Sequence, residues 1–475
     1  YAPIGYYENF NVRGFELDAA HSYTINGQTI AGEQNVALEN KQQVELLKGL
    51  AGLESGVSEP GGLVNYVTKR PTDVRSVTVS TDDRGSGYLA TDVGGFFGSE
   101  QQIGLRANLA HEDIHSYVEH TNGQRDFAAL ALDWTISDAA LLQLDVEYQN
   151  RQQRSAPGYQ LLGGTELPHH ASPKQLLAHQ SGANQVSTDA LNLNGNFEYR
   201  FSDTWKANLS ASRSRVVIDD YSSFAWGCYG AASCATSSVP NYFSPEGDYD
   251  IYDFRSPDDT RRTDEAQAML NGHFDALGVE HELTVGTSAQ RRTLDQRPYY
   301  NEWLGTGNIN TGAPAFAPSD KPVGASERRL DSRQYGLFVT DRIRFNEQWQ
   351  TILGGREVRL DEKAFDGVTG DQARASVDAA LALGRDAAAT ETELRAAGLG
   401  DAHIAEMLNH RTFRGNVPNS SLWLEALTPH TLGAMVALYE HKVFCQAALW
   451  GVHAYDQWGV ELGKTMAQAM EKAQS

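Results

Sequence analysis

Apolar and polar residues alternate with a period of two through most of the chain between Val74 and Asp361. In residues 205–212, for example, Trp, Ala, Leu and Ala alternate with Lys, Asn, Ser and Ser. This period is that of a β-strand with one apolar and one polar face. We predict three hairpins from it: Phe127–Ile136 with Leu141–Tyr148, Leu191–Phe201 with Trp205–Ile218, and Tyr335–Phe345 with Trp349–Leu360.

The segments between these strands fall into two length classes. Ser137–Asp138, Ser202–Asp203 and Asn346–Glu347 are short turns, whereas Arg151–Asp189 and Tyr221–Asp264 are long and polar. Short turns at one rim and long loops at the other are typical of an antiparallel transmembrane β-barrel with lipid outside and a wet lumen. The alternative is a soluble β-sandwich or propeller, which favours shorter strands and more even loops. We count about eleven candidate strands by this periodicity.

The pattern changes near residue 370. Short helical patterns with Gly and Asp at their ends cover Ser376–Gly384, Thr392–Ala397 and Ala402–Leu408. A longer one opens at Thr428–Pro429, because a proline in the first turn favours the start of a helix. The predicted fold is therefore mixed: strands in front and an all-α C-terminal segment behind, with a junction at 367–374.

Residues 1–72 carry glycine-rich motifs of a different kind. They include the sequences RGF at 13–15, VELLKG at 44–49 and PGGLVNYVTKR at 60–70. In this order the motifs resemble the plug domain of TonB-dependent outer-membrane receptors, particularly the ferric-siderophore group. The resemblance implies an α+β plug at 1–72, truncated at its N-terminus, and a partial receptor barrel at 73–366.

The same resemblance implies a function. Receptors of this family take up a ferric siderophore, with the TonB complex as partner, and perform no covalent chemistry and need no cofactor. A barrel that stops halfway would leave unpaired strand edges, so we expect the receptor not to be competent as it stands. Arg13, Lys48, Lys69 and Arg70 are interpreted as plug-to-wall ion pairs. The candidate ligand contacts are the aromatic residues of one long loop, although they also fit an interfacial girdle or a loop core: Tyr221, Phe224, Trp226, Tyr229, Tyr242 and Phe243.

The three cysteines have different surroundings. Cys228 and Cys234 flank a short polar loop, which favours a disulfide in an oxidising compartment over two separate thiols. No further Cys or His stands at ligand spacing, so we predict no metal site. Cys445 lies in an apolar helical pattern and is interpreted as a small core residue.

The amino-acid composition argues against one class of binding partner, nucleic acids. The 475 residues carry a formal net charge of −22, and 40% of them are apolar. Such an acidic surface repels phosphate backbones, so nucleic-acid binding is not expected.

The last hundred residues resemble a second family. The motifs are FRGN at 413–416, LTPHTLGA at 427–434, LYEHK at 438–442 and GVHAYDQWGVELGK at 451–464. Together they resemble the C-terminal end of glucose-6-phosphate isomerase, a cytoplasmic enzyme of α/β fold, over 375–475. The resemblance implies that Lys464 and Gln457 are catalytic, that the substrate is a sugar phosphate and that the partner is a second subunit of a homodimer. Lys464 also fits a solvated lysine at a helix end.

The sequence therefore supports two functions. The first is an outer-membrane siderophore receptor, and the alternative is glucose-6-phosphate isomerase in the cytoplasm. Whether the chain is an enzyme stays open, because the family's other catalytic groups lie upstream of this tail in sequence that the barrel segment replaces. A joining error in assembled DNA, a genuine recombination and a deliberate chimera all fit such a chain, and the first fits best because the two parts need opposite destinations.

Overall fold

The chain divides into two compact units, Tyr1–Pro418 and Asn419–Ser475. All residues that the computed structural model describes belong to the first unit. They are residues 5, 7–48, 61–169, 171–180, 184–230, 234, 241–316, 323–364, 384–385, 387–396, 404 and 413–414.

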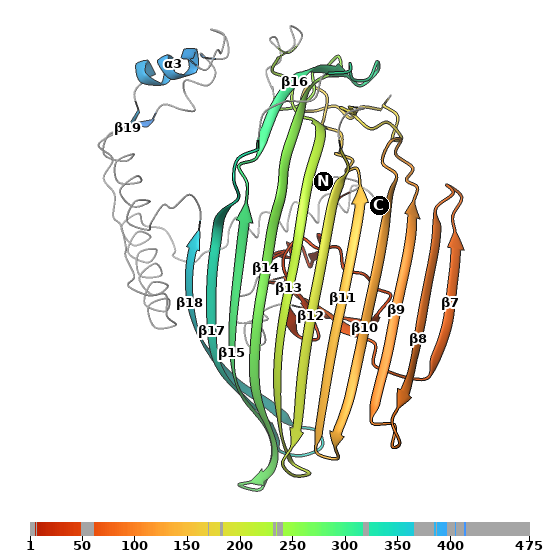
Figure 1. The fold of residues 1–475 in the computed structure, drawn as a ribbon. Helices are drawn as coiled ribbons and strands as arrows, with labels where there is room; N and C mark the ends of the chain where they lie inside the picture. Colours follow the sequence, from red (N-terminus) through yellow and green to blue (C-terminus); the bar gives the residue numbers. More distant parts are fainter. Residues whose placement is uncertain are drawn as a thin grey trace, which may run out of the picture. The chain divides into compact units, whose positions relative to one another are not determined.

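A twelve-stranded antiparallel sheet dominates the described residues (Figure 1). Its strands are β7 (Val74–Thr81), β8 (Gly87–Phe97), β9 (Ile103–Ile114), β10 (Gly123–Ser137), β11 (Ala140–Gln153), β12 (Val186–Arg200), β13 (Trp205–Ala225), β14 (Asp248–Ala276), β15 (Val279–Gln296), β16 (Tyr300–Asn308), β17 (Glu327–Arg344) and β18 (Gln350–Ala364). They pair in chain order, except that β16 pairs with the start of β14 and β17 therefore follows β15. The eleven strands along this path match the number predicted from the periodicity.

The three predicted hairpins are confirmed, and each is longer than its apolar pattern. The pairs β10–β11, β12–β13 and β17–β18 are in register over nearly their whole length. The long loop predicted over Tyr221–Asp264 is shorter than expected, because β13 continues to Ala225 and β14 begins at Asp248. These extensions pair polar residues through backbone hydrogen bonds, which a hydrophobic alternation cannot signal.

The two faces of this sheet differ in chemistry. One face, which we call the outward face, presents exposed apolar side chains such as Val146, Leu193 and Leu337. The other, the inward face, presents buried polar side chains such as Glu147 and Asn192. This distribution is expected of a sheet with hydrocarbon on one side and a filled polar lumen on the other.

Aromatic side chains on the outward face gather near the short turns. Trp205 and Phe274 stack with ring centroids 6.1 Å apart at the start of β13 and the end of β14. Further exposed aromatic residues of this rim are Trp134, Tyr199, Phe201, Phe345 and Trp349. Amphipathic rings at one level are typical of a membrane–water interface.

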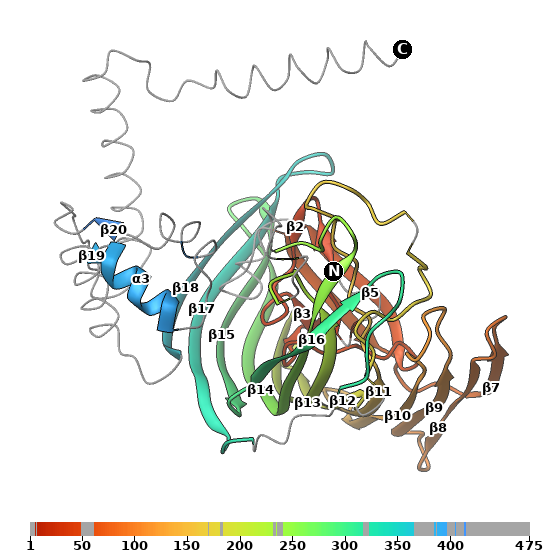
Figure 2. The ribbon, with the colours of Figure 1, turned by 90° about the horizontal axis from the view of Figure 1, so that it is seen from above.

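The N-terminal residues form a second, smaller body that we call the plug segment, residues 7–48 and 61–70. It contains the hairpin β1 (Asn11–Val12) and β2 (Phe15–Glu16) and a four-stranded sheet of order β4–β3–β6–β5. The strands of that sheet are β3 (Tyr23–Ile25), β4 (Gln28–Thr29), β5 (Lys41–Lys48) and β6 (Gly62–Thr68). Figure 2 shows this body within the curve of the large sheet.

Local sequence explains the turns of the plug segment. Asn26 and Gly27 join β3 to β4 with φ of 51° and 78°, the left-handed pair that a two-residue hairpin favours. Val12, Tyr23, Ile25 and Tyr66 contribute to its apolar core. The expected α+β character is corrected here: the described part of the plug segment contains strands and turns and no helix. Residues 44–48 of the VELLKG motif lie in β5, which pairs with β6 over Lys41–Lys48.

The C-terminal segment is described only in short pieces. Helix α3 (Ala387–Ala396) overlaps the helix predicted over Thr392–Ala397, but β19 (Gly384–Arg385) pairs with β20 (Phe413–Arg414). The prediction of an all-α segment is therefore not supported: two segments 28 residues apart exchange backbone hydrogen bonds, and a helical period does not reveal such a short ladder. The helix predicted from Thr428 lies outside the described residues. Among those described, no helix is long and apolar enough to span a membrane.

Candidate ligand-binding site

The plug segment is fastened to the inward face of the large sheet by ion pairs. Arg70 donates from Nη1 to Asp145 at 2.8 Å and from Nη2 to Asp133 at 2.5 Å. Lys69 lies 3.0 Å from Asp92, which also pairs with Arg106 at 2.7 Å. Arginine suits such a junction because its planar group bonds carboxylates in two directions at once.

These contacts test the prediction that Arg13, Lys48, Lys69 and Arg70 form ion pairs between the plug segment and the wall. Lys69 and Arg70 are confirmed. Arg13 and Lys48 are exposed and form no ion pair among the described residues, so for these two the prediction is not supported. Arg13 lies in the β1–β2 turn with φ of 55°, and Lys48 ends strand β5, whose side chains are exposed after Lys41.

A buried ion pair lies at the centre of the interface. Lys41 Nζ is 2.5 Å from Glu147 Oε2, and both side chains are more than nine-tenths buried. Asn40 and Asn192 donate to the same carboxylate at 2.8 and 3.0 Å. A buried charge needs such partners, because an unpaired one is strongly destabilising.

A polar pocket opens between the plug segment and the wall at the end of the sheet that carries the long loops. Its volume is 660 Å³, and it is lined by residues of the plug segment and of β7 to β11. Glu39 and Arg125 form an ion pair of 2.5 Å on its wall, and Arg125 also pairs with Glu112 at 2.9 Å. Volumes of this order suit small-molecule ligands.

Arg151 is the cation of this pocket with spare hydrogen-bonding capacity. Its Nη2 donates to Gln153 at 2.6 Å, whereas its Nε is buried and makes no hydrogen bond. It lines the pocket together with Tyr88 and Glu8. A guanidinium with an unused donor is suited to a ligand that brings a carboxylate or hydroxamate oxygen.

The pKa values of two glutamates of the plug segment are shifted in opposite directions. Burial raises the pKa of Glu8 above its ordinary value of 4.5, in spite of hydrogen bonds from Tyr66 and the Val36 amide. Burial also acts on Glu39, but the hydrogen bond and charge of Arg125 outweigh it and lower the pKa of that carboxyl. The difference follows from the guanidinium, which only Glu39 contacts.

An apolar cluster organises the long loops beyond the sheet. Leu177, Phe243, Tyr249 and Ile251 are buried in it, with Ile309 from the segment after β16. Segments far apart in the sequence therefore meet among the long loops.

The predicted ligand contacts occupy different positions in these loops. Trp226, Tyr229 and Tyr242 are exposed, Tyr221 is partly buried, and Phe224 stacks on Tyr252 with centroids 5.8 Å apart. Phe243 is fully buried against Tyr249, a position that suits loop structure. Three of the aromatic residues are therefore accessible to a ligand at the surface.

The disulfide loop is held by a buried carboxylate that the sequence did not single out. Cys228 and Cys234 are joined, with Cα atoms 5.1 Å apart. Asp250 Oδ2 accepts hydrogen bonds from the amides of Tyr229 and Gly230 at 2.6 and 3.1 Å, and its side chain is fully buried. An aspartate within a polar segment is expected to be solvated, so the sequence alone does not reveal that Asp250 is buried and accepts these hydrogen bonds.

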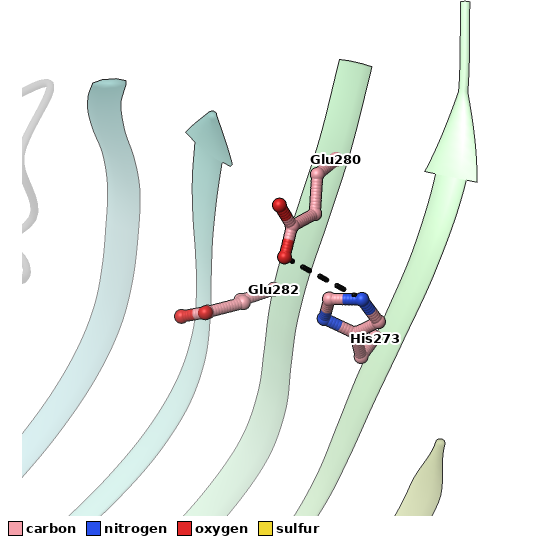
Figure 3. Close-up of side chains that lie close together, drawn as sticks. All are labelled: His273, Glu280 and Glu282. Carbon is pink, nitrogen blue, oxygen red and sulfur yellow. Dashed lines mark ion pairs between the residues drawn. The ribbon is translucent and has the colours of Figure 1, made fainter. Parts of the chain in front are cut away.

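One group of possible metal ligands lies near the opposite end of the sheet. His273, Glu280 and Glu282 bring their side chains together across β14 and β15 (Figure 3). Arg344 pairs with Glu280 at 3.2 Å and Arg342 with Glu282 at 3.3 Å. Because both carboxylates already have cationic partners, we interpret the group as an ion-pair network. The predicted catalytic residues Lys464 and Gln457 lie outside the described residues.

Solved structures resemble about three quarters of this chain. The ferripyoverdine receptor of the outer membrane of Pseudomonas aeruginosa, FpvA, has a TM-score of 0.63 at 20% identity and covers 75% of this chain and 47% of the receptor. The ferric preacinetobactin receptor BauA from Acinetobacter baumannii has a TM-score of 0.65 at 21% identity and covers 78% of this chain and 54% of the receptor. The chain thus spans about half of each receptor, and at this identity the likeness concerns the fold.

Sequence comparison assigns two parts of the chain to different families. The phosphoglucose isomerase family model matches residues 373–475. Glucose-6-phosphate isomerase of Pseudomonas fluorescens is 50% identical over 91 residues, which are 19% of this chain and 16% of that enzyme. The family model described as TonB dependent receptor-like, beta-barrel, matches residues 131–386, more than half of the chain. The protein is therefore a chimeric chain that belongs to the TonB-dependent receptor family and ends in a phosphoglucose isomerase segment.

Proposed function

We propose that the receptor part binds a ferric siderophore at the end of the sheet that carries the long loops. The observation that carries this proposal is the 660 Å³ polar pocket between the plug segment and the wall. It lies at the end of the sheet that carries the long loops, and residues of the plug segment form part of its lining. The solved receptors that this fold resembles are named for ferripyoverdine and ferric preacinetobactin.

Binding has two parts in this proposal. Trp226, Tyr229 and Tyr242 offer exposed rings around the disulfide loop for first contact. Arg151 then supplies a guanidinium group that lines the pocket. The ligand is held by non-covalent contacts, with no resident cofactor, and its transfer across the outer membrane depends on the TonB complex as partner.

The test is a titration of the purified chain, folded in detergent micelles, with ferripyoverdine, ferric preacinetobactin and a ferric catecholate. Tryptophan fluorescence reports binding. We expect saturable binding of one class of ferric chelate. Arg151→Gln should bind it about tenfold more weakly, because a charge-assisted hydrogen bond is lost.

The matched control is Arg359→Gln, which removes an exposed arginine on the outward face of β18. It should bind like the unaltered chain. Absence of saturable binding for all three chelates in a correctly folded sample would refute the proposal.

The isomerase segment supports a second, narrower candidate. Its sequence match is strong, but it corresponds to 16% of the enzyme. We expect no interconversion of glucose 6-phosphate and fructose 6-phosphate by the purified chain, since the remaining catalytic groups of the family are not in this segment. A coupled assay with complete isomerase as the positive control decides this, and turnover above background would establish the chain as an enzyme.

A further inference from the structure

An apolar groove runs along the outward face of strands β10 to β14. It has a volume of 780 Å³, and its lining includes Leu130, Leu144, Val146 and Leu193. Gly195 and Ala211 form part of the lining, so that the small residues leave a depression between larger neighbours. The groove ends at Arg213 and Asp264, which are joined by an ion pair of 2.5 Å.

Uncompensated positive charge lies directly beyond this end. Arg215 follows Arg213 on the same face of β13, about 7 Å further along the strand. Arg262 follows Asp264 on β14 and is the cross-strand partner of Arg215. Neither arginine forms an ion pair among the described residues.

This pairing is unfavourable for the sheet by itself. Like charges directly opposite each other destabilise a pair of strands. The Nε of Arg262 is buried and has no hydrogen-bond partner. Two opposed arginines with unused donors therefore indicate an anion that is supplied from outside the chain.

The position of Arg215 and Arg262 on the sheet indicates which kind of anion they bind. Arg215 and Arg262 lie between the apolar band of the outward face and the long loops, which is the level of lipid headgroups on that side of the membrane. A headgroup phosphate accepts several hydrogen bonds from guanidinium groups, and its acyl chain continues in the direction of the apolar groove.

We propose that this surface binds a phosphorylated lipid of the outer leaflet. Its acyl chain lies in the groove beside Leu144 and Leu193, and its phosphate lies between Arg215 and Arg262. The proposal rests on the outer-membrane location in the proposed function, but it does not depend on siderophore binding.

The experiment uses the purified chain in detergent and a defined probe, lipid A carrying its phosphates, with enzymatically dephosphorylated lipid A as the comparison. Native mass spectrometry measures the bound fraction. We expect on the order of 30-fold weaker binding for the double variant Arg215→Gln/Arg262→Gln, because each cationic side chain at such a surface contributes about a factor of five. Arg75→Gln is the matched control, since Arg75 is on the outward face of β7 opposite Val93.

Thermal unfolding separates a lipid site from a damaged fold. Without lipid A, Arg215→Gln should unfold at the same or a higher temperature than the unaltered chain, because an unfavourable pair is removed. With lipid A present the order should reverse. Ferric chelate titration of the same samples tests the proposed function separately.

Three results would overturn the proposal. The first is equal binding of lipid A by the unaltered chain and the double variant. The second is equal binding of the phosphorylated and dephosphorylated lipid, which would reduce the site to a groove for acyl chains. The third is a dimer, detected in the same spectra, that the double variant abolishes in the absence of lipid.

Discussion

The inward and outward faces of the large sheet are made from the same strands but are stabilised in different ways. On the inward face of β11, Asp145, Glu147 and Gln149 all bond to the plug segment. On the outward face of the same strand, Leu144 and Val146 are exposed. Partners come from within the chain on one face and from the membrane on the other.

The comparison shows that the alternation of apolar and polar residues marks opposite faces here and in a soluble sheet. A soluble sheet buries its apolar face, whereas this sheet buries Glu147 and Asn192 and presents its leucines outside. The inward face therefore depends on specific hydrogen bonds, and the outward face depends on the hydrocarbon around it. Substitutions that exchange these requirements test the comparison directly.

The largest effect is expected at the centre of the inward face. Lys41→Met removes the cation that pairs with Glu147 and leaves a buried carboxylate, which costs about 3–5 kcal/mol. Urea unfolding of the folded chain, followed by tryptophan fluorescence, measures this loss.

The control is Lys206→Met, which removes an exposed pair with Glu198 and should cost about 0–1 kcal/mol. Similar losses for the two variants would mean that the buried pair has no special role.

A charge on the outward face should have the next largest effect. Val285→Arg places a guanidinium in the apolar band and should cost about 2–4 kcal/mol in lipid vesicles. Gln267→Arg is the inward counterpart, beside Glu265, and should cost much less. Unfolding in vesicles of defined lipid compares the two, and equal costs would contradict the assignment of the faces.

A smaller effect separates two glutamates of the plug segment by pH. The raised pKa of Glu8 means that the folded state holds its proton more tightly, so this contribution to stability is present below about pH 4.5 and is lost as the pH rises through the raised pKa. Glu39 behaves in the opposite sense: its contribution is present above pH 4.5 and is lost as the pH falls through the lowered pKa.

Unfolding midpoints across the acid range should therefore change in opposite directions for Glu8→Gln and Glu39→Gln relative to the unaltered chain. Parallel changes would show that Arg125 does not set the pKa of Glu39.

The smallest effect is expected where a predicted pair is absent. Lys48→Met should change the free energy of unfolding by no more than about 0.5 kcal/mol, since the side chain is exposed on β5 and has no acidic partner among the described residues. A clear loss in the same urea titration would mean that this lysine contacts a group outside those residues.

The strands and their faces could be predicted from the sequence because the period of two extends over many residues. The partners across the interface could not be predicted. Arg70 and Asp145 are 75 positions apart, and the pair Lys41–Glu147 is separated by 106. Which wall residue meets which plug residue depends on the tilt and stagger of the strands, and local patterns do not contain that information.

The candidate site was predicted only in its local features. The cysteine pair and the exposed aromatic residues are visible as residue types in a polar loop. The polar pocket is not visible, because Glu39, Arg125 and Arg151 come from three elements that only the fold brings together. Asp250 was missed for a similar reason, since its amide partners lie about 20 positions away.

The distribution of the plug contacts has a mechanical consequence. Counted along the chain, the plug segment forms ion pairs with the wall at Glu33, Glu39, Lys41, Lys69 and Arg70 in turn. A force that moves the whole body along the sheet has to break these contacts together, so they share the load. A force applied near residue 7 loads them one after another, and the body then peels away from the wall at a much lower force.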